Sequence, residues 1–106
     1  MFARHVTLQL KSNLVREFPS AFEKEIIPLL RKQKGFLDEM LFFTPETFDA
    51  IAISLWEEKE HAETYNREVY PQVVRILEKY IEGNPVVKPL EVKYSTFQKI
   101  AIPAKA

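Results

Sequence analysis

The chain has 106 residues, its 15 Lys and Arg balance 15 Asp and Glu, and it contains no cysteine. This length is near the commonest size of one domain, so we expect a single domain over residues 1–106 with a substantial core. The balanced charge shows no basic stripe, which argues against nucleic acid and anionic membranes as partners. The absence of cysteine excludes disulfides and fits a reducing compartment.

Hydropathy argues against secretion and membrane insertion. The first residues, MFARH, lack the apolar core of a signal peptide, and no apolar run approaches the length of a membrane span. We therefore expect a cytoplasmic protein without a membrane partner. Aromatic residues make up 12% of the chain, an excess for a small neutral protein that hints at a surface buried by a partner.

The first predicted strand runs from Phe2 to Lys11, where mostly apolar residues alternate with more polar ones. Ser12 favours the start of a helix, and an apolar stripe at helical spacing predicts that this helix continues to about Lys34. Gly35 ends it. We expect Pro28 to bend the helix, because proline removes a backbone donor.

Two further strands, Phe36 to Thr44 and Phe48 to Trp56, are predicted on either side of a proline-containing turn, and we expect them to form a hairpin. A second helix is predicted from Glu57 to Glu82, with a kink at Pro71. The segment Gly83-Asn84-Pro85 is expected to end this helix.

A fourth strand is predicted from Val86 to Phe97, and Pro89 places it partly at an edge of the sheet. Residues 97–106 form a C-terminal tail. The resulting order, β-α-β-β-α-β, is typical of an α+β ferredoxin-like sandwich, in which two helices cover one face of a four-stranded antiparallel sheet.

The second and third strands carry apolar residues on both faces, although two helices can cover only one face. Strict alternation along the second strand gives Phe36, Met40 and Phe42 on one face and Leu37, Leu41 and Phe43 on the other. The third strand places Phe48 and Trp56 opposite Ile51, Ile53 and Leu55. A sheet with one face in water should alternate apolar with polar residues. We therefore predict a two-fold homodimer that packs sheet against sheet.

Three stretches resemble the antibiotic biosynthesis monooxygenase superfamily of dimeric α+β barrel proteins. They are LLRKQKGFLDEML at 29–41, AISLWEEKEHAETYNREVYPQVVRIL at 52–77 and PVVKPLEV at 85–92. The resemblance spans about residues 2–97. It implies two ferredoxin-like protomers that pair their sheets into a barrel, with a pocket in each protomer between helices and sheet. Known members include cofactor-independent oxygenases of quinol-like or polyketide aromatics, and haem-degrading enzymes.

The chain departs from two branches of this superfamily. The haem-degrading branch relies on an Asn on the first strand and on a Trp and a His on the second helix. The matching positions here hold Arg4, Tyr65 and, approximately, Val74, so haem degradation is not implied and we expect no cofactor. Aromatic-polyketide oxygenases carry an Asn four residues before the Trp that ends the strand, and Ala52 stands there instead.

Trp56 and Tyr65 are the first candidates for a substrate pocket. Trp56 shares its strand face with three small residues, Ala50, Ala52 and Ser54, which leave space beneath a helix. That space could be a pocket, or it could let the helix pack closely with Trp56 as core. The Tyr65 hydroxyl could position a phenolic substrate, or Tyr65 could equally be a core residue.

Candidates for proton transfer and charge stabilisation lie on the first strand. His5 stands on the polar face beside Thr7, and histidine is the side chain best suited to exchange a proton near neutral pH. Arg4 is the alternative residue facing the pocket and a candidate partner for an anion, because a one-residue slip in register exchanges faces. Neither His5 nor His61 has a partner at metal-ligand spacing, so no metal site is expected.

Tyr70 precedes Pro71, whose kink could shape the mouth of a pocket or could only curve the helix. The predicted function is a cofactor-independent monooxygenase of a small electron-rich aromatic or quinol-like molecule. In this hypothesis Trp56, Tyr65, Ser54 and Tyr70 line the pocket, and His5 and Arg4 act in catalysis. The alternative is a non-catalytic dimeric protein that binds a small apolar ligand or serves as an accessory protein.

Overall fold

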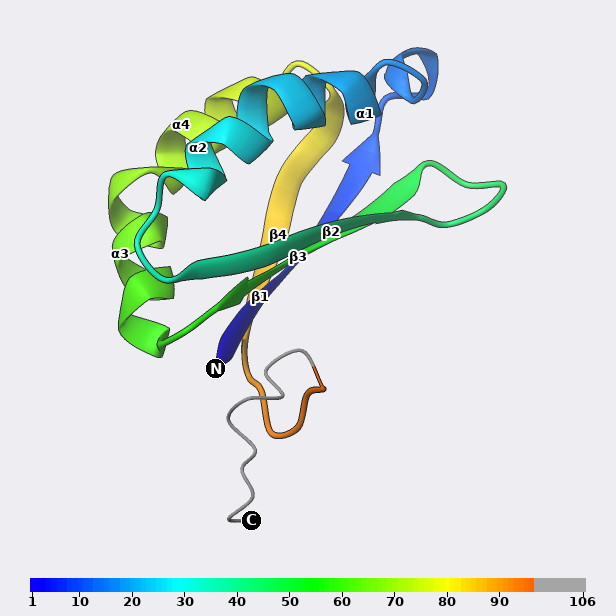
Figure 1. Ribbon diagram of the computed structural model, residues 1–106. Helices are drawn as coiled ribbons and strands as arrows, with labels where there is room; N and C mark the ends of the chain where they lie inside the picture. The colour runs from blue at the N-terminus through cyan, green and yellow to red at the C-terminus, as the bar shows by residue number, and fades with distance from the viewer. Residues whose placement is uncertain (97–106) are drawn as a thin grey trace.

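The computed structural model describes residues 1–96. Four strands form one antiparallel sheet in the order β2-β3-β1-β4, namely β1 (Phe2–Leu10), β2 (Phe36–Phe43), β3 (Asp49–Trp56) and β4 (Ile81–Glu91). The helices cover one face of this sheet (Figure 1). The predicted α+β ferredoxin-like fold is therefore confirmed, whereas the predicted tail at 97–106 lies outside the described residues.

The first helical segment begins with a 3-10 turn, η1 (Ser12–Leu14). It continues as α1 (Phe18–Ala21), the π-helical η2 (Phe22–Ile26) and α2 (Ile27–Arg31). The π-helical turn directly precedes α2, and Pro28 stands in the first turn of α2. Ile27 donates its backbone N–H to the carbonyl of Phe22, five residues earlier. The wide turn leaves Phe22 and Ile26 both buried toward the sheet.

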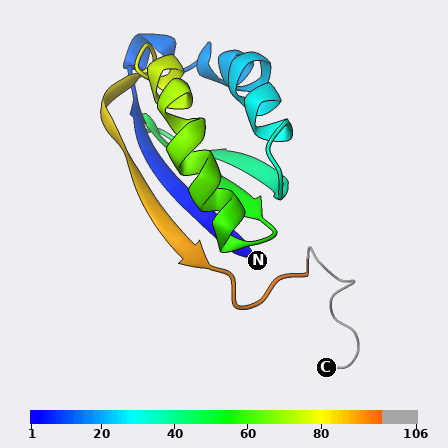
Figure 2. The same ribbon diagram turned by 90° about the vertical axis from the view of Figure 1, so that its left-hand side faces the viewer.

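The second helical segment consists of α3 (Lys59–Glu68) and α4 (Tyr70–Leu77). It lies beside the first segment, on the same side of the sheet (Figure 2). The two helices meet at Val69, whose φ of −118° departs from helical geometry. Pro71 stands in the first turn of α4, where its missing N–H costs no helical hydrogen bond. The predicted kink at Pro71 is confirmed.

The predicted end of this helix was wrong, because α4 stops at Leu77 and β4 already begins at Ile81. Gly83-Asn84-Pro85 lies inside β4, where the register against β1 shifts between the pairs Thr7–Val86 and Gln9–Glu82. Gly83 takes a positive φ of 67° at this irregularity. Strand β4 is at the sheet edge, as predicted, and an edge strand tolerates prolines that cannot donate to a neighbour.

Strand β3 follows the predicted alternation. Its helix-facing residues, Ala50, Ala52, Ser54 and Trp56, are all buried. In β2 the predicted alternation fails at the start, because the register against β3 shifts between Phe36 and Asp38. Phe36 pairs with Trp56 and therefore shares the helix-facing side with Leu41 and Phe43, not with Met40 and Phe42.

The outer face of the sheet carries apolar residues without a helix over them. Ile51, Ile53 and Leu55 of β3 are half-buried there, and Met40 and Phe42 of β2 are exposed. The expectation of apolar residues on both faces of β2 and β3 is confirmed. Within residues 1–96, no helix combines the length and the apolar character needed to cross a membrane.

Candidate functional site

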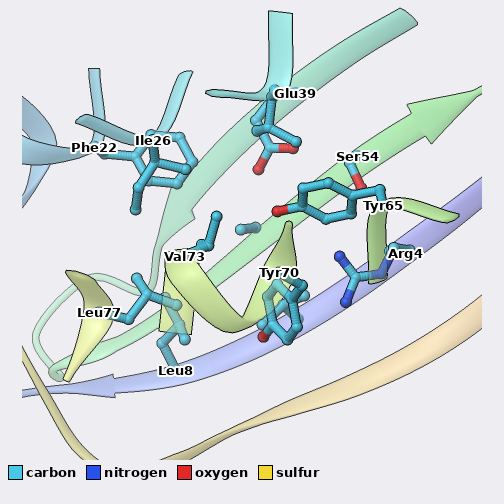
Figure 3. A pocket seen from close by; sticks show the side chains of 13 residues that line it. Arg4, Leu8, Phe22, Ile26, Glu39, Ser54, Tyr65, Tyr70, Val73 and Leu77 are labelled. Carbon is cyan, nitrogen blue, oxygen red and sulfur yellow. The ribbon is translucent and has the colours of Figure 1, made fainter. Parts of the chain in front are cut away.

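A cavity of about 30 Å³ lies between the sheet and the two helical segments that cover it. Most of its lining is aliphatic or aromatic, but β1, β2, β3, α3 and α4 each contribute one polar residue (Figure 3). These polar residues are Arg4 of β1, Glu39 of β2, Ser54 of β3, Tyr65 of α3 and Tyr70 of α4. The site thus gathers polar side chains from five elements into one apolar space.

Arg4 is 4% exposed, and its pairing with Ser54 and Pro89 places it on the helix-facing side of the sheet. Its Nη2 donates a hydrogen bond to Asn66 Oδ1 at 2.9 Å. The guanidinium carbon lies 4.3 Å from the ring centroid of Tyr70 and 4.9 Å from that of Tyr65. The ion pairs found among the described residues do not include Arg4. This buried cation is therefore held by two ring faces and an amide rather than by an ion pair.

Glu39 was missed by the sequence analysis. Its carboxyl points into the cavity (Figure 3), and its Oε1 is buried without a hydrogen-bond partner among the described residues. Burial raises the pKa of Glu39 from 4.5 to about 8, although the Arg4 charge lowers it and Asp38 adds a smaller increase. The available signal was an acidic residue in an apolar strand, in phase with the helix-facing residues Leu41 and Phe43.

Both tyrosines keep their hydroxyl protons in this site. Burial raises the pKa of Tyr65 and of Tyr70, and the Arg4 guanidinium only partly opposes the rise. The Tyr70 hydroxyl is buried and, within residues 1–96, forms no hydrogen bond of ordinary geometry, although Arg4 is close enough to act on it electrostatically. The two hydroxyls are therefore available as neutral hydrogen-bond donors.

Trp56 lies behind the cavity and does not line it. Its indole is fully buried and donates a hydrogen bond to Ser54 Oγ at 2.9 Å. Its ring centroid lies 5.0 Å from that of Tyr65 and 5.6 Å from that of Phe36. Trp56 thus supports Tyr65 from beneath, whereas Ser54, Tyr65 and Tyr70 reach the cavity wall.

His5 is placed on the other side of the sheet. It pairs with Ile53 and Lys88 and shares the outer face with Thr7, so its side chain does not line the cavity and is not placed to act there as a base. His61, in α3, packs against Gly35. In the part of the chain that the structure describes, no three acidic or histidine side chains gather as a metal ion would require.

An open groove of about 430 Å³ adjoins the cavity between α3 and the strands β1 and β4. Its apolar wall is formed by Phe2, Ala62, Val87 and Pro89. Its polar wall is formed by Arg4, Lys59, Glu63 and Asn66. Arg4 lines both the groove and the cavity, so it is the residue that the two spaces share.

No known family's sequence profile matches the chain. No curated protein matches it either. Solved structures do match: a monooxygenase of Streptomyces coelicolor from the gene ActVA-Orf6, in complex with Nanaomycin D, aligns with a TM-score of 0.74 at 12% identity, over 89% of this chain and 88% of that one. SnoaB, a cofactor-independent oxygenase of Streptomyces nogalater, aligns with a TM-score of 0.73 at 12% identity, over 89% and 94% of the two chains.

A third structure, of an antibiotic biosynthesis monooxygenase, aligns with a TM-score of 0.69 at 13% identity, over 87% of this chain and 98% of that one. The chain has the fold of the antibiotic biosynthesis monooxygenases. The resemblance found in the sequence is confirmed at the level of fold, and what these neighbours bind or catalyse remains a statement about them.

Proposed function

We propose that the protein is a cofactor-independent monooxygenase that acts on a small electron-rich aromatic or quinol-like molecule. The observation that carries this proposal is the convergence of Arg4, Glu39, Tyr65 and Tyr70 on one apolar cavity. A protein that only binds an apolar ligand needs apolar space and one orienting group. A buried cation beside an unpaired carboxyl is more than such a protein needs, which favours catalysis over the non-catalytic alternative.

In such a reaction the substrate itself reduces oxygen after losing a proton. An anthrone illustrates the balance: its methylene becomes a carbonyl, one oxygen atom of O2 enters the product and the other leaves as water. The protein then has to bind the substrate anion, donate hydrogen bonds to it and exclude water. Arg4 would stabilise the negative oxygen, and the hydroxyls of Tyr65 and Tyr70 would act as donors.

The dimensions of the site support a division of the ligand between two spaces. The cavity, at about 30 Å³, has room for one or two waters but not for an aromatic ring. The groove of about 430 Å³ is large enough for a small aromatic molecule and shares Arg4 with the cavity. The ring is therefore proposed to lie in the groove, with its oxygen against the Arg4 guanidinium.

The proposed partner of the protomer is a second copy. The outer sheet face carries Ile53 and Leu55 together with the exposed Met40, Phe42 and Leu90, and a matching apolar face on another protomer would cover these side chains. The cytoplasmic setting stays a prediction from the sequence.

Oxygen uptake by the purified protein with a panel of quinols and anthrones tests the proposal. Arg4→Met removes the cation but keeps a long apolar side chain, and we expect it to lower turnover about 100-fold or more. Arg31→Met, at an exposed position of α2, is the matched control and should leave turnover unchanged. If the protein binds members of the panel but consumes no oxygen with any of them, the non-catalytic alternative replaces this proposal.

A further inference from the structure

Of the described residues that line the cavity, Glu39 is the one acid. It follows the shift in register between Phe36 and Asp38 and pairs with Ser54 on the helix-facing side of the sheet. The carboxyl and the Tyr65 hydroxyl point into the same space (Figure 3). The Oε1 of this carboxyl is buried and accepts no hydrogen bond from the described residues, which is unusual for a buried polar atom.

The surroundings of Glu39 contain few other charges. Arg4 faces it from β1, Tyr65 from α3 and Tyr70 from α4, and Asp38 adjoins it in β2. Ser54, opposite on β3, is neutral. The first helical segment contributes only apolar residues to the cavity lining, namely Phe22, Ile26 and Leu30. The charged and titratable groups around Glu39 are therefore one cation, one neighbouring carboxyl and two hydroxyls.

We propose that Glu39 is the proton acceptor of this site, taking the hydroxyl proton of a phenol or quinol whose oxygen lies against the Arg4 guanidinium. The transfer is direct or passes through one water, for which the cavity has room. The inference rests on the proposed function for its class of ligand. It can be tested without oxygen or turnover.

The step balances in protons and charge. The O–H bond of the ligand breaks, its proton bonds to a carboxylate oxygen of Glu39, and the electron pair stays on the ligand oxygen as a phenolate. The negative charge thus moves from Glu39 to an atom beside Arg4. Burial favours the neutral carboxyl that forms, and Arg4 stabilises the phenolate, so both changes help the transfer.

The transfer predicts an unusual exchange of protons with the buffer. Burial raises the pKa of Glu39 to about 8, so the free protein holds this proton near pH 7 and has lost it near pH 9. Binding a phenol as phenolate must then release about one proton near pH 7, because Glu39 is already occupied. Near pH 9 the ionised Glu39 keeps the proton, so almost none is released.

The experiment is calorimetric titration with hydroquinone under nitrogen, near pH 7 and near pH 9, in two buffers of different ionisation enthalpy. The wild-type protein should release about one proton at the lower pH and about none at the higher pH. Glu39→Gln, which has the same shape, should show the same proton count at both pH values. Glu25→Gln, at an exposed position of η2, is the matched control and should behave as wild type.

A second readout removes ambiguity about the fold and the ligand. Ultraviolet difference spectra should show bound hydroquinone ionised in the wild-type protein near pH 9, and circular dichroism should show that Glu39→Gln is folded. A wild-type proton count that does not change with pH, a count in Glu39→Gln that falls toward zero near pH 9 as in the wild type, or a failure of hydroquinone to bind would each overturn the proposal. Proton transfer without oxygen uptake would instead retain Glu39 as acceptor and remove the monooxygenase function.

Discussion

The indole N–H of Trp56 donates a hydrogen bond to the hydroxyl oxygen of Ser54, 2.9 Å away and two residues earlier on the same face of β3. Both side chains are buried. A buried indole needs an acceptor, and the small residues beside it leave room for the ring to fold back over its own strand. The bond fixes the surface on which Tyr65 rests.

Removing the acceptor should cost stability. Ser54→Ala leaves the indole N–H buried and unpaired, and we expect the free energy of unfolding in urea to fall by about 1–3 kcal/mol. Ser20→Ala, at an exposed position of α1, should change it by less than about 0.5 kcal/mol. Equal stability of wild type and Ser54→Ala would mean that another group or water satisfies the indole.

Alanine substitutions at two glycines allow the stability cost of backbone strain to be measured separately from that of steric overlap. Gly35 and Gly83 both have positive φ, of 81° and 67°. A side chain at Gly35 would overlap the imidazole of His61, whereas nothing lies within 4 Å of the position at Gly83. Gly83→Ala should therefore cost only the backbone contribution, about 1 kcal/mol, and Gly35→Ala should cost clearly more.

Thermal and urea unfolding of the two alanine variants test this order. A His61→Ala change made together with Gly35→Ala removes the overlapping ring, so the double variant should recover part of the lost stability. If the two glycine variants are equally stable, the packing of His61 on Gly35 does not constrain the loop.

Sequence alone predicted the features that depend on local periodicity. The buried side of β3, the kink at Pro71 and the edge position of β4 follow from alternation and from proline chemistry. The choice between Arg4 and His5 needed the pairing of β1 with β3, because alternation fixes two faces but does not tell which one the helices cover.

The features that sequence analysis missed depend on irregular pairing between strands. The register shift after Phe36 moves that residue to the helix-facing side, and nothing in the run FLDEMLFF marks it. Gly83-Asn84-Pro85 has the composition of a helix stop, yet it forms an irregularity within β4. Alternation alone does not show that Glu39 lines a cavity, because the facing residues Tyr65 and Tyr70 come from helices that are distant in sequence.

The raised pKa of Glu39 also implies that the stability of the fold varies with pH. The pKa of Glu39 is about 8 in the folded protein and near 4.5 when exposed, so between these values the folded state holds a proton that the unfolded state has lost. The unfolding free energy should therefore decrease as pH rises through this window, by up to about 1.4 kcal/mol per pH unit. Above about pH 8 this contribution levels off.

Urea unfolding of wild type and Glu39→Gln at several pH values measures this contribution. Glu39→Gln cannot ionise, so its advantage over the wild-type protein should grow from pH 5 to about pH 8. The exposed control Glu25→Gln should follow the wild-type curve throughout. Parallel curves for wild type and Glu39→Gln would show that Glu39 titrates alike in the folded and unfolded chains.

The outer sheet face gives the last prediction. Ile53 lies at the centre of this face, between His5 and Met40 on the neighbouring strands, and a second protomer would bury it. Light scattering of the wild-type protein should give twice the chain mass of 12.4 kDa. Ile53→Lys should give monomers, because a buried unpaired charge costs more than the contact returns, while Thr64→Lys on the exposed side of α3 should leave the mass unchanged. A monodisperse wild-type monomer at micromolar concentration would exclude the homodimer and leave this apolar face for another partner.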